Sequence, residues 1–313
     1  MNIWVVQKQM IIIFLLIFVG VYLFKKKHLS NETAKQLSWI IVNVTNPITL
    51  LCAALSQEQK TGIKDLGTAF LCFALMYAVL IPVSYLIPVL LRVEKGRRYS
   101  YRMLSIFGNV GFIGIPFASA VLGPESLIFV SICGLMFNLV IYTYGAASMK
   151  KTALLQHPDR TDGDSFSLRD IINTGTVMSV VTIAVYLADL KVPDMIGSTL
   201  SYIGSCTTFL SMIVLGVSVA QMIPKEVFTR WRLYVFLLVR QILIPVIFIL
   251  ILRPFIKNGL ILSTVTVMAA MPAGNMPLMM AKQYGVKEDI ISAGIILTTV
   301  AAIVTIPAVM FFL

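Results

Sequence analysis

Residues 108–116 read GNVGFIGIP and lie inside an apolar segment, residues 99–122, that is long enough to be a membrane helix. Three glycines and a proline are unusual in such a helix. Glycine costs about 1 kcal/mol relative to alanine, and an interior proline costs about 3 kcal/mol and removes a hydrogen bond. A break in the helix is therefore predicted. In hydrocarbon, the freed backbone groups must be buried in protein or line a wet cavity, so a break at mid-membrane depth indicates a site.

A second stretch of the same kind, MPAGNMP, occupies residues 271–277 near the other end of the chain. It also lies in an apolar segment and contains an asparagine, a glycine and two prolines. Kinks that only shape helix packing are the alternative explanation for either stretch. Two such stretches in corresponding places, each with an asparagine, favour a site.

The composition is that of a membrane protein that crosses the bilayer several times. The chain is 58% hydrophobic and 12% charged, and its mean hydropathy of +0.90 excludes a soluble domain of 313 residues. The net charge of +11 comes from basic residues in short loops, so no binding to nucleic acid is expected. The four cysteines lie in apolar segments and never form CxxC, which indicates neither disulfides nor a zinc site.

About 20 apolar residues span a bilayer, and the chain contains ten segments of about that length. Five segments lie on each side of a charged linker at residues 150–170, which divides the chain into residues 1–149 and 171–313. An odd number of spans per half means that any repeat has inverted topology. VLIPV at 79–83 and ILIPV at 242–246 are traces of such a repeat. The segments are residues 6–24, 37–55, 66–91, 99–122, 126–149, 171–190, 196–222, 231–255, 260–284 and 289–312.

The distribution of lysine and arginine predicts how the chain is oriented. Of the 25 basic residues, 18 lie at the connections after the odd-numbered segments, 6 lie on the opposite side, and Arg240 lies inside a segment. Basic residues are enriched in cytoplasmic loops. We therefore expect a multi-pass protein of the cell membrane with both termini extracytoplasmic.

No catalytic site can be assembled at membrane depth. The apolar segments contain no deep Asp or Glu, and the only two histidines, His28 and His157, lie in loops. HExxH, Walker A and GxSxG motifs do not occur. The chain is therefore not expected to be an enzyme, and no metal or cofactor is predicted.

Neutral hydrogen-bonding groups remain at membrane depth. Asn109 and Asn275 lie in the two breaks, where each amide supplies two donors and each restarting half-helix supplies partial positive charge. This arrangement suits an anion. The alternative is that such side chains only join neighbouring helices. The same two readings apply to Asn43, Thr45 and Asn46 before Pro47, and to Ser205, Thr207, Thr208 and Ser211.

Arg240 is the one charge near the middle of a segment. Placing it there costs several kcal/mol, which makes a functional role the default hypothesis. Because no acidic residue lies at comparable depth, its partners must be carbonyls, water, a cavity or an anionic ligand. A structural role and an effect of its field on anion selectivity both stay open.

Three stretches resemble the auxin efflux carrier family, whose members include bacterial malate-permease-like proteins and the plant PIN auxin exporters. They are NPITLL at 46–51, GNVGFIGIPFASAVLG at 108–123 and MPAGNMPLMMAKQYG at 271–285. The resemblance covers essentially the whole chain. It implies an all-α membrane protein of ten transmembrane helices, arranged as two inverted five-helix repeats whose broken helices 4 and 9 cross. The linker at 150–170 is much shorter than the hydrophilic loop of the plant exporters.

The resemblance implies a transporter that binds a substrate carboxylate beside the crossing, at Asn109 and Asn275. We expect a small organic anion, a mono- or dicarboxylate, carried by alternating access. The alternatives are a sodium-coupled carrier resembling the bile-acid symporters, a sensor on the same fold, and a channel. The lipid bilayer is the expected environment, and a homodimer is one candidate assembly. The expected site residues are Asn46, Pro47, Gly108, Asn109, Gly111, Pro116, Arg240, Pro272, Gly274 and Asn275.

The orientation can be tested by cysteine labelling in intact cells. In a variant without the native cysteines, a cysteine that replaces Arg97 should not react with an impermeant thiol reagent, because its loop is predicted to be cytoplasmic. A cysteine added at either terminus should react. Labelling at position 97 from outside would show that the topology is inverted.

Overall fold

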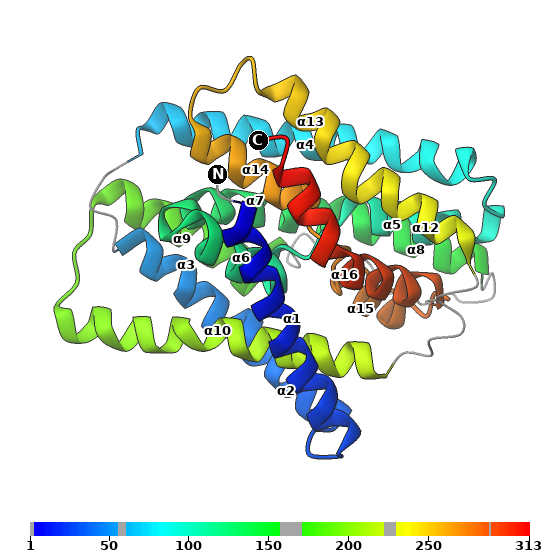
Figure 1. Ribbon diagram of the computed structural model, residues 1–313, viewed down its shortest axis with the longest axis horizontal. Coiled ribbons are helices and arrows are strands. Elements are labelled where there is room, and N and C mark those ends of the chain that lie inside the picture. The colour runs from blue at the N-terminus through cyan, green and yellow to red at the C-terminus, as the bar shows by residue number, and fades with distance from the viewer. Residues whose placement is uncertain (1–2, 56–60, 157–170, 222–229, 288) are drawn as a thin grey trace.

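The computed structural model describes residues 3–55, 61–156, 171–221, 230–287 and 289–313, and these parts of the chain are helical throughout apart from turns and connections. Figure 1 shows their arrangement. The helices are α1 (Ile3–Lys25), α2 (Asn31–Ile40), α3 (Asn46–Leu55), α4 (Ile63–Leu90), α5 (Arg98–Ile106), α6 (Ile115–Leu122), α7 (Leu127–Val140), α8 (Ala146–Gln156), α9 (Thr174–Ala188), α10 (Asp194–Ala220), α12 (Trp231–Leu238), α13 (Ile244–Leu252), α14 (Gly259–Ala270), α15 (Met276–Tyr284) and α16 (Asp289–Met310).

All ten predicted segments are helical in the described residues. Seven helical stretches are long and apolar enough to cross a membrane. Three shorter apolar helices fall in the fourth, sixth and ninth segments, at Val110–Leu122, Thr174–Ala188 and Gly259–Ala270. The fourth and ninth are short because each segment is broken in two. The protein is therefore an all-helical membrane protein with seven to ten apolar spans.

The first residues of the predicted linker are helical. The linker is predicted at residues 150–170, and α8 continues to Gln156. Residues 150–156 read KKTALLQ, and Lys, Ala, Leu and Gln are good helix formers with no glycine or proline among them. The rest of the predicted linker, residues 157–170, lies outside the described residues.

Helical turns of the wide π type precede three prolines. Residues 41–45, 110–114 and 239–243 form these turns, and the prolines follow as the second residue of α3, α6 and α13. A proline has no N–H and its ring clashes with the carbonyl four residues earlier, and a wider turn relieves that clash. Each proline is therefore accommodated in a continuing membrane helix.

The helices form two groups. In the first group, α1 packs along α10, and α3 packs against both α9 and α10. In the second group, α4 packs against α5 and α7, and α16 packs against α5, α12 and α14. In Figure 1, α10 lies along one long side of the molecule, and α4 and α13 lie along the opposite side. The groups meet where α7 contacts α9 and where α10 contacts the turn at residues 110–114.

Two glycines set the close approach of α1 and α10. A Cβ atom on Gly20 would lie 2.5 Å from the Ile213 carbonyl oxygen, and one on Gly216 would overlap the carbonyl oxygen of Ile17. Small residues let membrane helices approach until their backbones touch. Any side chain at either position must therefore push the two helices apart.

This packing can be tested by substitution. Gly216→Val should lower the midpoint of thermal unfolding by about 5 °C or more, because overpacking costs about 1–3 kcal/mol even where atoms can shift. Gly67→Val in α4 is the matched control, since a Cβ atom there meets no atom within 4 Å. Equal midpoints for the two purified variants would contradict the close α1–α10 contact.

Candidate functional site

The two predicted breaks meet in space. Residues 107–109 separate α5 from the turn that leads into α6, and residues 271–275 separate α14 from α15. Gly108 and Ala273 form an isolated antiparallel bridge between these two stretches. We call this pairing of residues 107–109 with residues 271–275 the crossing.

Backbone hydrogen bonds hold the crossing together. The Asn109 N–H donates to the Pro272 carbonyl oxygen at 2.7 Å, and the Gly274 N–H donates to the Phe107 carbonyl oxygen at 2.9 Å. In hydrocarbon an unpaired backbone group costs several kcal/mol. Each break avoids part of this cost because its N–H group bonds a carbonyl of the other break. The sequence left the centre of the second break open between Pro272 and Gly274-Asn275. The structure places it between them.

Close backbone contact requires a glycine at position 274 of the crossing. A Cβ atom on Gly274 would lie 2.8 Å from the Gly108 carbonyl oxygen. On the other side, the Ala273 N–H donates to the Thr298 hydroxyl at 3.1 Å. Thr298 belongs to α16 and is 1% exposed. The sequence analysis did not single it out, because one threonine in an apolar helix carries no distinctive signal.

The Asn109 side-chain amide has one atom in a hydrogen bond and one atom without a bond to the described residues. Its Oδ1 accepts the Phe112 N–H at 3.0 Å and so caps the half-helix that restarts after the break. This bond fixes the amide with its Nδ2 pointing elsewhere, and Nδ2 is buried without a hydrogen-bond partner among the described residues. A buried donor without a partner costs about 1–3 kcal/mol. Asn109 therefore offers two N–H donors that the protein does not use.

Asn46 approaches the same turn from α3. Its Nδ2 donates to the Gly111 carbonyl oxygen at 3.4 Å, while its Oδ1 is buried without a partner. Asn275 likewise has a buried Oδ1 without a partner. Unused acceptors thus accompany the unused donors of Asn109. In the described ranges, no three His, Cys, Asp or Glu side chains gather closely enough to hold a metal ion.

The prolines of the predicted site contribute through the backbone. Pro47 and Pro116 each follow a wide helical turn, which relieves the clash of the proline ring within a continuing helix. Pro272 supplies the carbonyl that accepts the Asn109 N–H. The prolines therefore shape the crossing, whereas the polar side-chain atoms come from the asparagines.

Thr49 and Thr207 join two helices of the first group. Their hydroxyl oxygens lie 2.8 Å apart, and Thr49 Oγ1 also lies 3.0 Å from the Gly204 carbonyl oxygen. The helix-joining alternative thus holds for Thr207. Its partner Thr49 was missed because it follows Pro47 by two residues in an otherwise apolar stretch.

Arg240 lies close to the crossing and is 3% exposed. Its Nε donates to the Ser105 carbonyl oxygen, and its Nη1 donates to the Ala269 carbonyl oxygen at 2.7 Å. These carbonyls belong to the last turns of α5 and α14, the ends at which a helix carries partial negative charge. Arg240 therefore has carbonyl partners, one of the possibilities that the sequence left open. Its effect on anion selectivity stays a prediction.

Gln241, next in the chain, extends this polar layer. Its Nε2 donates to the Thr298 carbonyl oxygen at 3.0 Å, and Gln241 is 1% exposed. The hydroxyl of the same threonine accepts the Ala273 N–H. A polar Arg-Gln pair at membrane depth was visible in the sequence and could have indicated such a network.

Loss of the Arg240 charge should destabilise the fold. Arg240→Gln leaves the ends of two half-helices without a cation, and two hydrogen bonds to a charged group together contribute about 3 kcal/mol or more. We expect the midpoint of thermal unfolding to fall by roughly 6 °C or more. Arg253→Gln, at an exposed site after α13, is the control. An unchanged midpoint with weakened anion binding would instead assign Arg240 to selectivity.

Comparison with known proteins gives the class of the molecule. A sequence model described as membrane transport protein matches residues 5–310. The chain is 24% identical over 310 residues to an uncharacterized transporter of Methanocaldococcus jannaschii, covering 95% of each protein. It is 21% identical over 297 residues to an uncharacterized transporter of Methanothermobacter thermautotrophicus, covering 94% of each. Members of the matching family are transporters and typically not enzymes. The chain therefore belongs to the membrane transport protein family, the auxin efflux carrier family of transporters.

Proposed function

We propose that this transporter carries a small organic anion, a mono- or dicarboxylate, and binds its carboxylate group beside the crossing. The observation that carries the proposal is the buried, unpartnered Nδ2 of Asn109. Its two N–H groups point away from the bond that caps the half-helix, and they suit a carboxylate oxygen. The half-helix that starts at Val110 adds partial positive charge.

The neighbouring charge also favours a site of this kind. Arg240 binds the carbonyl ends of α5 and α14, so its guanidinium neutralises the negative ends of the two half-helices. The N-terminal ends of the half-helices that follow the two breaks carry partial positive charge. No carboxylate neutralises it, since the described membrane helices hold no acidic residue at this depth. Neutral donors bind an anion without a fixed ion pair, which favours release as well as binding.

The position of the site suits alternating access. Asn46 belongs to α3 of the first helix group, and its bond to the Gly111 carbonyl joins the second group. A substrate between Asn46 and Asn109 lies at the boundary of the two groups. Sliding of one group against the other exposes that boundary to either side in turn. We also retain the inverted repeat as part of this proposal, because an antiparallel bridge such as that at Gly108 and Ala273 has local two-fold symmetry.

Sodium coupling is the second candidate. Asn46 Oδ1 and Asn275 Oδ1 are buried acceptors without partners, and oxygen atoms of this kind bind sodium in other carriers. Uptake of labelled mono- and dicarboxylates into proteoliposomes separates the candidates. Uptake that needs an inward sodium gradient favours coupling, and uptake without sodium favours a proton-coupled carrier or a uniporter. Flux that never saturates would favour a channel.

Substitution of Asn109 tests the anion site. Asn109→Ala should lower the affinity for a transported carboxylate roughly ten- to a hundredfold, because a hydrogen bond to a charged group contributes about 1.5–3 kcal/mol. Asn109→Asp should be worse. It keeps an oxygen that can cap the Phe112 N–H, but it places a second carboxylate against the substrate.

Asn43→Ala is the matched control for these variants. Asn43 lies one turn before Asn46, and among the described residues its amide donates only within its own helix, to the Trp39 carbonyl. Affinity would be measured by equilibrium binding to purified variants with wild-type thermal stability. Wild-type affinity in both Asn109 variants would remove Asn109 from the site and with it the main reason to prefer an anion.

A further inference from the structure

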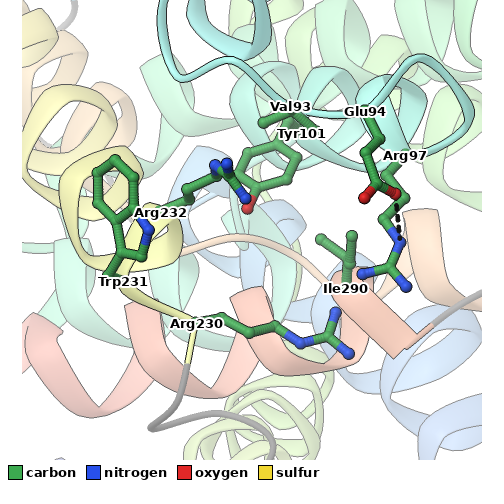
Figure 2. Close-up of a pocket in the computed structure, with 8 residues that line it drawn as sticks. All are labelled: Val93, Glu94, Arg97, Tyr101, Arg230, Trp231, Arg232 and Ile290. Atoms are coloured by element: carbon green, nitrogen blue, oxygen red, sulfur yellow. Dashed lines mark ion pairs between the residues drawn. The ribbon is translucent and has the colours of Figure 1, made fainter.

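A pocket of about 170 Å³ lies at one end of the second helix group, away from the crossing. It is formed by the connection between α4 and α5 and by the starts of α12 and α16. Three arginines, Arg97, Arg230 and Arg232, line it (Figure 2). Arg232 precedes Arg240 by eight residues in the same helical segment, which corresponds to about 12 Å along the axis. The proposed transport site does not use this pocket.

The arginines of the pocket are incompletely paired. Arg230 Nη2 lies 2.9 Å from Asp289 Oδ2, but Arg230 Nη1 is buried without a hydrogen-bond partner. Arg232 donates from Nε to the Leu91 carbonyl oxygen at 3.0 Å, and no carboxylate of the described residues pairs with it. Among the residues that the structure describes, the lining of the pocket thus has a buried donor and more arginines than carboxylates.

The third arginine has only a weak partner. Arg97 Nε lies 3.7 Å from Glu94 Oε2, and the two side chains are 52% and 79% exposed. An exposed pair of this kind contributes little to stability. Of the carboxylates that the structure describes, Glu94 and Asp289 pair with two of the three guanidinium groups. An anion with several oxygens, such as a phosphate group, matches the remaining donors, since guanidinium groups bind phosphate through paired N–H bonds.

The position of the pocket indicates where the phosphate comes from. The pocket lies where α4 ends and α12 begins, and the adjoining Leu90 and Trp231 side chains are 79% and 61% exposed. Exposed leucine marks a surface that faces lipid, and tryptophan is enriched at the membrane–water interface. This end of the bundle also carries the basic loops that predict the cytoplasmic side. Basic pockets between membrane helices on that side suit anionic lipid headgroups.

We propose that the pocket binds the phosphate of an anionic phospholipid, held by Arg97, Arg230 and Arg232. Figure 2 shows these side chains approaching from the α4–α5 connection and from the start of α12. Bound lipid connects these elements and binds the folded protein, so it stabilises the fold. It does so independently of any substrate at the crossing.

The test measures thermal unfolding of the purified full-length protein in a neutral detergent. Short-chain phosphatidylglycerol should raise the unfolding midpoint in a saturable manner, whereas phosphatidylcholine of the same chain length should not. Inorganic phosphate and glycerol 3-phosphate are tested in parallel as water-soluble ligands that carry the same phosphate chemistry. A response to either that equals the response to phosphatidylglycerol would overturn the assignment of the pocket to lipid.

Variants assign the effect to the pocket. Arg97→Gln and Arg230→Gln should each raise the apparent dissociation constant for phosphatidylglycerol about tenfold, through loss of a hydrogen bond to a charged group. Glu94→Gln should lower it about two- to fivefold, because the phosphate no longer competes with a carboxylate. Arg253→Gln, at the other end of the α12–α13 segment, should leave it unchanged.

Arg97 and Glu94 lie on an exposed connection, and in the described residues neither side chain bonds another helix, so their variants test the proposal even if Arg230→Gln fails to fold. Equal stabilisation of the wild type, Arg97→Gln and Glu94→Gln by phosphatidylglycerol would overturn it.

Discussion

Every backbone group inside a membrane needs a partner, and the centre of this protein follows from that constraint. A continuous helix meets it automatically, but residues 107–109 and 271–275 do not continue their helices. They pair with each other instead, through Asn109 to Pro272 and Gly274 to Phe107. Glycine is needed at Gly274, since a side chain there would strike the Gly108 carbonyl. The Thr298 hydroxyl supplies a further partner, for the Ala273 N–H.

Breaking two helices also separates charge within the membrane. Each first half-helix ends with partial negative charge, and each second half-helix starts with partial positive charge. Arg240 lies at the two negative ends, where it binds the Ser105 and Ala269 carbonyls. One buried cation thus stabilises two half-helices and needs no acidic partner. The proposed anion site uses the partial positive charge at the starts of the second half-helices.

The sequence predicted the elements of this arrangement better than their contacts. The ten apolar segments, the two breaks and the asparagines within them follow from local rules of hydropathy and backbone preference. A cluster of glycines and prolines in an apolar run predicts a break, whereas single prolines such as Pro82 and Pro307 lie inside continuous helices. The continuation of α8 to Gln156 also follows from local preference, because most residues of KKTALLQ are good helix formers.

Long-range register could not be predicted in this way. The pairing of Gly108 with Ala273 depends on how two distant segments pack, and no local pattern encodes it. The same holds for the partners of Arg240 and for the bond between Thr49 and Thr207. The π turns before Pro47, Pro116 and Pro245 were also missed, because a proline in a sequence predicts strain but not how the preceding turn relieves it.

The pairing of the two breaks can be measured directly by a disulfide between positions 108 and 273. Gly108 and Ala273 are opposite residues flanked by two hydrogen bonds, an arrangement in which Cα atoms lie about 4.5 Å apart, within disulfide range. A Cβ atom on Gly108 meets only ordinary contacts, the nearest at 3.4 Å. In a variant without native cysteines, Gly108→Cys with Ala273→Cys should form the disulfide almost completely under mild oxidation and stay folded. Two free thiols in a folded, oxidised sample would contradict the crossing.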